Sequence, residues 1–161
     1  MPQSRREFMK CSATSSFLAL AGHSVFADDP VTHSGKIKVA QIGSKHAHAD
    51  GKLATLRKLS DLYEIIGVVE TDPIAVKRIQ NHPTYQGLPI LSEQELFETE
   101  GLQAVAVETS IDQLLPTARR CLEHGLHIHL DKPAGAAEID SARKLFRFAE
   151  SKQLTVQMGY M

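Results

Sequence analysis

The sequence lacks an excess of charge of either sign. Its 161 residues include 18 Lys and Arg against 19 Asp and Glu, which gives a formal net charge of -1. The basic residues are scattered beyond the start of the chain, so there is no electrostatic footprint for DNA or RNA. We therefore predict no nucleic-acid partner. The 42% hydrophobic and 23% charged content is ordinary for a single globular domain with a real core.

Cysteine is also scarce. Only Cys11 and Cys121 are present, and Cys11 lies in an N-terminal segment that we expect to be removed. The mature chain would then keep one cysteine, so no intramolecular disulfide can form even in an oxidising compartment. Cys121 falls within a helical pattern and is predicted to be a small buried hydrophobic residue.

The N-terminus carries an export pattern. The stretch "SRREFMK" resembles a twin-arginine signal, with Arg5 and Arg6 as the pair and with Phe8 and Lys10 in their usual places. The apolar run that follows is short for a membrane span and ends in small residues, as signal peptidases require. We expect the twin-arginine export machinery as a partner and the periplasm as the destination.

These boundaries divide the chain into three parts. Cleavage is expected after Ala27, so residues 1–27 are the predicted signal peptide, 28–35 a linker, and 36–161 the folded domain.

Beyond the linker, segments with strand character alternate with segments of helical period. Strands are expected at 36–42, 63–69, 87–91, 102–109, 126–131 and 154–160, and helices at 50–62, 72–82, 92–100, 110–125 and 136–152. Such alternation with short connections predicts parallel strands joined by right-handed crossovers, hence a doubly wound α/β domain with helices on both faces of the sheet. Ligands bind such sheets beyond the carboxyl ends of the strands.

The loop after the first expected strand, "QIGSKHAHADGK", lies where a nucleotide-binding loop belongs but has few glycines. When G-x-G-x-x-G is overlaid on it, Gly43 takes the first glycine position, Lys45 the second and His48 the third. Gly43 can make the tight turn out of the strand. Lys45 lies where the backbone should approach a pyrophosphate, so its side chain either adds a charge-assisted contact or occupies the space of the phosphate.

The next strand ends bring further polar candidates. Glu70 can accept hydrogen bonds from the two hydroxyls of an adenosine ribose, and its charge would repel a 2′-phosphate, which favours NAD over NADP. The alternative for Glu70 is a solvated loop residue. Thr109 and Ser110 either contact the ligand or cap the following helix, since Ser is a preferred N-cap residue.

The segment "LDKPAG" follows the fifth strand and places Asp131, Lys132 and Pro133 at its end. A lysine held there can donate to a substrate hydroxyl or polarise a carbonyl, and the proline stiffens the turn that aims it. The alternative is an ordinary surface lysine.

Taken together, the glycine loop, the acidic end of the second strand, "HIHLDKPAG" and the closing "MGYM" resemble the Gfo/Idh/MocA family of glucose-fructose oxidoreductase and inositol dehydrogenase relatives. Its hallmark is E-K-P after the fifth strand; here Asp131 replaces Glu, while Lys132 and Pro133 match.

This resemblance implies a Rossmann-type NAD(P)-binding domain over 36–161, with Lys132 as the active-site lysine near the nicotinamide and the hydroxyl of a sugar or polyol substrate. The predicted cofactor-binding residues are Gly43, Ser44, Lys45, His46, Glu70, Thr109, Ser110, Asp131, Lys132 and Pro133.

Members of this family continue into an α+β domain that supplies the substrate pocket and a histidine acid or base. Because this sequence ends at Met161, we expect it to represent the nucleotide-binding half without that domain, and whether it acts alone as an enzyme stays open. Two alternatives remain: a non-catalytic binding or interaction module in which Lys45 has closed the phosphate site, and a piece of a longer reading frame. The oligomeric state is not indicated.

Two His-x-His pairs, His46 with His48 and His127 with His129, raise the question of a divalent metal ion. No carboxylate or cysteine accompanies either pair at a characteristic spacing, and the strand that carries the second pair is expected to be buried. The sequence therefore predicts no metal site.

Overall fold

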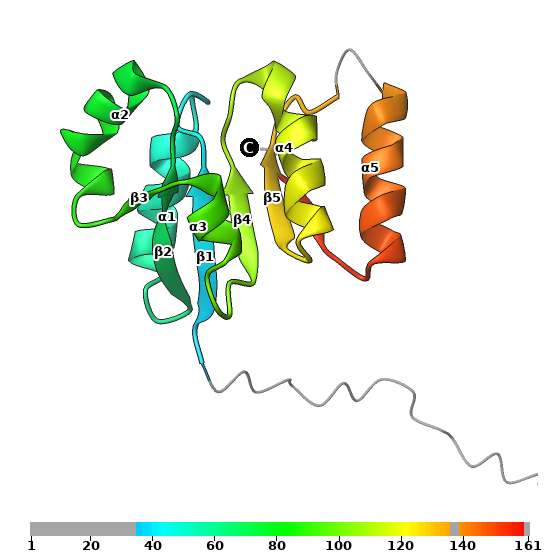
Figure 1. Ribbon diagram of the computed structural model, residues 1–161, viewed down its shortest axis with the longest axis horizontal. Coiled ribbons are helices and arrows are strands. Elements are labelled where there is room, and N and C mark those ends of the chain that lie inside the picture. The colour runs from blue at the N-terminus through cyan, green and yellow to red at the C-terminus, as the bar shows by residue number, and fades with distance from the viewer. Residues whose placement is uncertain (1–34, 136–138, 160–161) are drawn as a thin grey trace, which may run out of the picture. The chain divides into compact units, whose positions relative to one another are not determined.

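A computed structural model describes residues 35–135 and 139–159 of the chain, and contains a six-stranded sheet flanked by helices (Figure 1). The strands are β1 (Ile37–Ile42), β2 (Tyr63–Val69), β3 (Ile90–Leu91), β4 (Ala104–Val107), β5 (His127–Asp131) and β6 (Val156–Gly159). The helices are α1 (Ala49–Lys58), α2 (Pro73–Gln80), α3 (Glu93–Phe97), α4 (Ile111–Glu123) and α5 (Ile139–Ser151), with a 3-10 turn η1 (Pro83–Tyr85).

The sheet has the strand order β3-β2-β1-β4-β5-β6, and every neighbouring pair is parallel. The chain therefore winds outward from β1 to β3, returns to the middle, and winds outward again from β4 to β6. This confirms the predicted doubly wound α/β fold. The loops after β1 and β4 diverge at the point where the direction reverses, and such a point opens a crevice at the carboxyl edge of the sheet.

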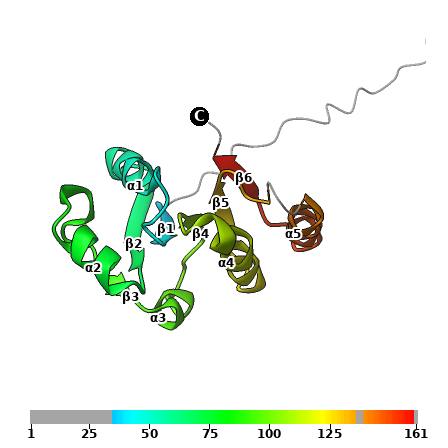
Figure 2. The ribbon, with the colours of Figure 1, turned by 90° about the horizontal axis from the view of Figure 1, so that it is seen from above.

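The two faces of the sheet carry separate hydrophobic clusters. Helices α3, α4 and α5 cover one face, while α1 and α2 cover the other, and Figure 2 shows α1 and α4 on opposite sides of the strands. The first cluster contains Leu96, Leu114, Ala118, Cys121, Leu122, Leu145 and Ala149, and the second contains Leu53, Ile79 and Tyr85. Burial raises the pKa of Cys121 to about 12, as expected for a thiol that serves only as packing.

Several helix starts follow from local sequence. Asp72 caps α2 by accepting from the amides of Ile74 and Ala75, with Pro73 in the first turn. A capping box of Ser92 and Glu95 begins α3. These caps place the β2 to α2 and β3 to α3 connections at the carboxyl edge of the sheet.

Some predicted boundaries were wrong. Helix α1 ends at Lys58 rather than continuing to Leu62, because the carbonyl of Leu62 accepts from the amide of Ile37 and so belongs to the start of the sheet. The predicted signal peptide 1–27 and all but the last residue of the linker 28–35 lie outside the described residues. Among the helices that the structure describes, none combines the length and the apolar character needed to cross a membrane.

Gly43 is required by close contact as well as by backbone conformation. Its φ is +85°, and a Cβ added there would lie 2.8 Å from the carbonyl oxygen of Glu108 and from the Cα of Thr109. Gly87 has a similar φ of +76° but nothing within 4 Å of the corresponding Cβ position. A comparison of alanine substitutions at the two positions therefore distinguishes the cost of backbone strain from the cost of steric overlap.

We predict that Gly43→Ala lowers the free energy of unfolding by about 1 kcal/mol or more beyond the effect of Gly87→Ala. Both variants incur the left-handed strain of about 1–2 kcal/mol, but only the first forces backbone atoms apart. Urea unfolding followed by circular dichroism measures both. Equal losses of stability in the two variants would contradict the packing argument.

Candidate functional site

A cleft opens at the carboxyl edge of the sheet between the loops that follow β1, β2 and β4. Five of the predicted cofactor-binding residues line it: Gly43, Lys45, Glu70, Thr109 and Ser110. Its position is the switch point of the sheet, where a doubly wound fold binds its ligand. Asp131 and Lys132 lie at the end of β5, and the ring of His46 reaches the carbonyl of Lys132 from the β1 to α1 loop.

Backbone hydrogen bonds fix the first turn of that loop. The amide of Gly43 donates to the carbonyl of Val69 at 2.8 Å, and the amide of His46 donates to the carbonyl of Glu108 at 3.1 Å. The loop thus bridges the ends of β2 and β4. Gly43 makes the turn as predicted, and the neighbouring backbone of β4 leaves no room for a side chain there.

Glu70 holds the same loop from the side of β2. Its Oε2 accepts from the amide and hydroxyl of Ser44 at 2.9 and 2.6 Å, and its Oε1 accepts from the amides of Thr71 and Asp72 at 2.9 and 3.1 Å. A carboxylate has about four lone-pair positions, so those of Glu70 are taken by the protein. Sequence reasoning missed this structural role, and a ribose hydroxyl would have to exchange with one of these donors.

The side chain of Lys45 lies toward α2. Its Nζ is 2.7 Å from Oδ2 of Asp72, and the Lys45 side chain is 48% exposed. The hydrogen bond to Asp72 raises the pKa of Lys45. Exposed ion pairs contribute only about 0–1 kcal/mol, so a competing anion can draw Lys45 away from Asp72 at small cost.

Arg78 secures the outer side of the loop. It donates to the carbonyl of Ser44 at 2.8 Å and to both carboxylate oxygens of Asp50 at 2.8 and 3.1 Å. The hydroxyl of Tyr85 also donates to Asp50, at 2.7 Å. Arg78 is therefore already paired with a carboxylate.

Thr109 and Ser110, the two hydroxyl residues after β4, lie in the cleft as expected. Ser110 occupies the N-cap position of α4, but its side chain makes no capping hydrogen bond, so of the two alternatives capping through the hydroxyl is not observed and contact with a ligand stays a prediction. The hydroxyl of Thr109 donates to the carbonyl of Ser110 at 3.2 Å. Both residues line the cleft.

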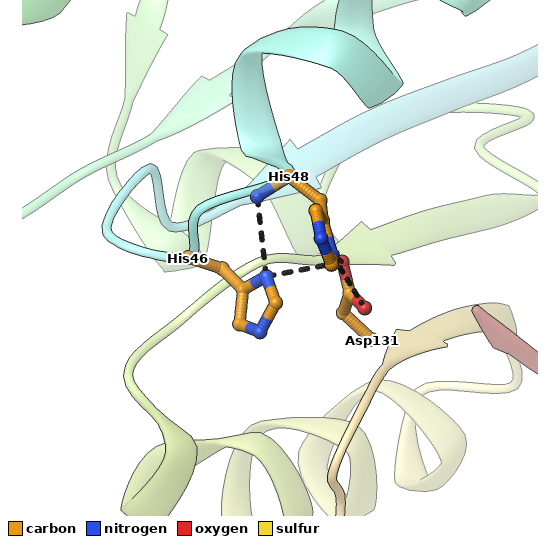
Figure 3. A group of neighbouring side chains, drawn as sticks. All are labelled: His46, His48 and Asp131. Atoms are coloured by element: carbon orange, nitrogen blue, oxygen red, sulfur yellow. Dashed lines mark hydrogen bonds and ion pairs between the residues drawn. The ribbon is translucent and has the colours of Figure 1, made fainter. Parts of the chain in front are cut away.

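On the other side of the loop, His46 and His48 converge on Asp131 (Figure 3). The Nδ1 of His48 is 3.0 Å from Oδ2 of Asp131, and the Nδ1 of His46 is 3.1 Å from the same oxygen. The carboxylate is 83 residues from His48 in sequence. The sequence near this pair offers no carboxylate at a characteristic spacing, and the fold supplies one from β5.

The remaining residues of "DKP" lie just beyond this cluster. The backbone amide of Lys132 donates to Oδ1 of Asp131 at 2.6 Å, and the peptide bond between Lys132 and Pro133 is cis. Lys132 is half-buried and Pro133 is exposed. Burial alone would raise the pKa of Asp131, but the hydrogen bonds from Lys132 and His48 outweigh it and lower the pKa.

Glu108 is a site residue that sequence reasoning missed. It directly follows the buried strand β4, is 0% exposed, and neither carboxyl oxygen has a hydrogen-bond partner among the described residues. Burial, and then the charge of Asp131, raises the pKa of Glu108 to about 8. The available signal was an acidic residue immediately after the apolar run "AVAV", which is the same signal that singled out Glu70 after β2.

Comparison with known proteins agrees with this arrangement. Residues 37–160 match the Gfo/Idh/MocA family, described as an oxidoreductase family with an NAD-binding Rossmann fold. A search of curated proteins finds no match.

Solved structures of oxidoreductases share the fold of this domain. A protein of Yersinia pestis described as an oxidoreductase is 27% identical, with a TM-score of 0.63, over 78% of this chain and 34% of its own. The WlbA dehydrogenase of Chromobacterium violaceum, solved with NADH and UDP-GlcNAcA, is 21% identical, with a TM-score of 0.65, over 77% of this chain and 35% of its own.

A variant of KijD10, a 3-ketoreductase of Actinomadura kijaniata solved with TDP-benzene and NADP, is 22% identical, with a TM-score of 0.65, over 78% of this chain and 39% of its own. The chain thus spans about a third of the length of the solved relatives that it matches.

The raised pKa of Glu108 predicts how stability depends on pH. Between the usual value near 4.5 and about 8, the folded state holds a proton that the unfolded state has lost, so the free energy of unfolding falls as pH rises. The slope is at most about 1.4 kcal/mol per pH unit. Glu108→Gln should flatten it, whereas exposed Glu150→Gln should not.

Urea unfolding at pH 6, 7 and 8, with EDTA present to remove stray metal ions, measures this slope. Identical slopes for the wild-type chain and Glu108→Gln would show that Glu108 does not hold its proton in the folded state.

Proposed function

Because the chain belongs to the Gfo/Idh/MocA oxidoreductase family and carries its NAD-binding Rossmann domain, we propose that the switch-point cleft binds the dinucleotide for hydride transfer on a sugar or polyol. The observation that carries this proposal is the convergence of Gly43, Glu70 and Thr109 on one cleft beyond β1, β2 and β4. Bound there, the dinucleotide supplies a nicotinamide that accepts or donates hydride.

The residues present fit such a cofactor. The tight turn at Gly43 brings the loop backbone to the mouth of the cleft, and α1 begins at Ala49, where the loop ends, so that its N-terminus favours an anion. Lys45 adds a cation on a flexible side chain. Because the Lys45 side chain is exposed and its pair with Asp72 is screened by solvent, we infer that Lys45 exchanges Asp72 for the pyrophosphate, which carries more negative charge.

The charges around the cleft favour NAD over NADP. Glu70 places a carboxylate where the adenosine ribose would lie, and it would repel a 2′-phosphate. Two arginines near the cleft, Arg78 and Arg120, already pair with Asp50 and Glu93. The related structures were solved with NADH in one case and NADP in another, so the preference of this chain rests on its own residues.

Lys132 is the proposed catalytic lysine. Asp131 and the ring of His46 both bond to its backbone, which fixes the position of the residue at the end of β5. From there its ammonium group is proposed to donate to the reacting substrate oxygen. The sugar nucleotide in the WlbA structure supports a sugar-like substrate, for which the family's second domain would supply the rest of the pocket.

A non-catalytic binding module is the second candidate. The observation that favours it is Lys45, which occupies the position where a glycine would let the backbone approach the pyrophosphate. In that case the side chain of Lys45 excludes the phosphate, and a substitution that removes this side chain would open the site.

Calorimetric titration of the full chain with NADH and NADPH tests the proposal. We predict saturable binding of both, tighter for NADH, and about tenfold weaker binding of NADH by Lys45→Gly because one charge-assisted contact is lost. Lys36→Gly, an exposed lysine at the opposite end of β1, serves as the matched control and should leave the affinity unchanged.

Two outcomes would count against this account. Absence of binding to either dinucleotide at millimolar concentration excludes the cofactor role. Tighter binding by Lys45→Gly than by the wild-type chain would instead support the module in which Lys45 closes the site.

We also propose that the domain is exported by the twin-arginine route, which carries folded proteins and so allows a cofactor to be loaded in the cytoplasm. The support is the "SRREFMK" stretch and the short apolar run after it. In a bacterial host, we predict that the full chain is recovered from the periplasm and that the double variant Arg5→Lys, Arg6→Lys stays in the cytoplasm. The same distribution for both chains would refute export through this signal.

A further inference from the structure

The cluster of His46, His48, Asp131 and Glu108 has a second feature that dinucleotide binding does not explain. The two histidines come from the β1 to α1 loop, Asp131 from the end of β5 and Glu108 from the end of β4 (Figure 3 shows the first three). One nitrogen from each histidine and one oxygen of Asp131 lie within 4.8 Å of one another. Oε2 of Glu108 is 3.7 Å from Nδ1 of His46.

The hydrogen bonds of His46 decide its tautomer. Its Nε2 is 2.8 Å from the carbonyl oxygen of Lys132, and a carbonyl can only accept, so Nε2 carries the proton. The amide of His48 donates to Nδ1 at 3.3 Å, so Nδ1 presents a lone pair. Yet Oδ2 of Asp131 is only 3.1 Å from this Nδ1. In this tautomer two acceptors face each other without a proton between them, and either a second proton on the His46 ring or a bound cation would make the contact favourable.

Glu108 points to the same conclusion independently. Its carboxyl group is fully buried, and neither oxygen has a hydrogen-bond partner in the described part of the chain. The protonated carboxyl group can share its proton with Asp131, and a bound metal ion would take the place of that proton, since a buried carboxylate charge has to be paired or bound to a metal. Lys52, a nearby cation, already donates to Nε2 of His129 at 2.9 Å.

We propose that His46, His48 and Asp131 form a binding site for a divalent transition-metal ion of the Zn²⁺ type, with Glu108 as the fourth ligand. Two imidazoles with carboxylates suit zinc and its first-row neighbours rather than Mg²⁺ or Ca²⁺. Tetrahedral zinc with bonds of about 2.0–2.1 Å holds its ligand atoms about 3.3 Å apart. The observed 3.0 and 3.1 Å from Asp131 to the two Nδ1 atoms come close to this value.

The surroundings of His46 also match those of a metal ligand. Ligating histidines usually donate their other ring N–H to a backbone carbonyl or carboxylate, which fixes the ring and its tautomer. Here that acceptor is the carbonyl of Lys132. A metal ion in this site would therefore connect the β1 to α1 loop to the residue proposed as catalytic. The inference goes beyond the proposed function and does not depend on dinucleotide binding.

Calorimetric titration of the full chain with Zn²⁺, in the absence of any dinucleotide, tests this site. We expect one ion to bind with Kd of about 1 µM or tighter, and His46→Gln and His48→Gln each to weaken binding about tenfold or more. The matched control is His127→Gln, an exposed histidine of the other His-x-His pair, which should bind Zn²⁺ as the wild-type chain does.

Circular dichroism checks that each variant is folded. Because the side chain of His48 is 23% exposed, His48→Gln is expected to fold even if His46→Gln does not. Substitution by Co²⁺ gives a second measurement, since its visible absorption reports a tetrahedral site with nitrogen and oxygen ligands, and this absorption should be lost in His48→Gln. No saturable heat up to about 100 µM Zn²⁺, or equal affinity in wild type and folded His48→Gln, would overturn the proposal.

Discussion

The loop between β1 and α1 is held in place by polar contacts from three neighbouring strand ends, and the candidate site depends on this constraint. Glu70 at the end of β2 binds Ser44, the backbone of Glu108 at the end of β4 accepts from His46, and Asp131 at the end of β5 binds His48. Each such hydrogen bond contributes about 0.5–1.5 kcal/mol, and more where a charge takes part. A loop that has lost two of the three usual glycines is therefore positioned by its side chains.

This constraint has a consequence for ligand binding. In a glycine-rich loop the backbone itself approaches the phosphates, whereas here the charged side chain of Lys45 is available and is bound only by an exposed ion pair. The same loop delivers His46 and His48 to the carboxylate of Asp131. The proposed dinucleotide cleft and the proposed metal site therefore lie on opposite sides of the β1 to α1 loop. Lys132 contacts this loop through its backbone carbonyl, which accepts a hydrogen bond from His46.

Local patterns were enough to predict most of the fold. The alternation of β-branched runs with helical periods correctly indicated six parallel strands, and helices α2 and α3 begin within one residue of the expected starts at 72 and 92. The position of the site at the carboxyl ends also followed, because strand order alone brings those ends together. Contacts between distant segments could not be predicted, since no local period encodes that Asp131 meets His48 or that Glu70 meets Ser44. Glu108 was missed although a local signal for it was available, namely an acidic residue directly after the apolar run of β4.

The central claim is that this preformed loop is the dinucleotide-binding element. The most direct measurement is the two-dimensional amide NMR spectrum of the full chain recorded with increasing NADH. The account predicts saturable shifts concentrated in the amides of 43–50, with smaller ones after β4 and β5, and little change at the opposite end of the sheet. Saturating NADH that leaves the amides of 43–50 unshifted, or that shifts only residues far from the carboxyl edge, would contradict it.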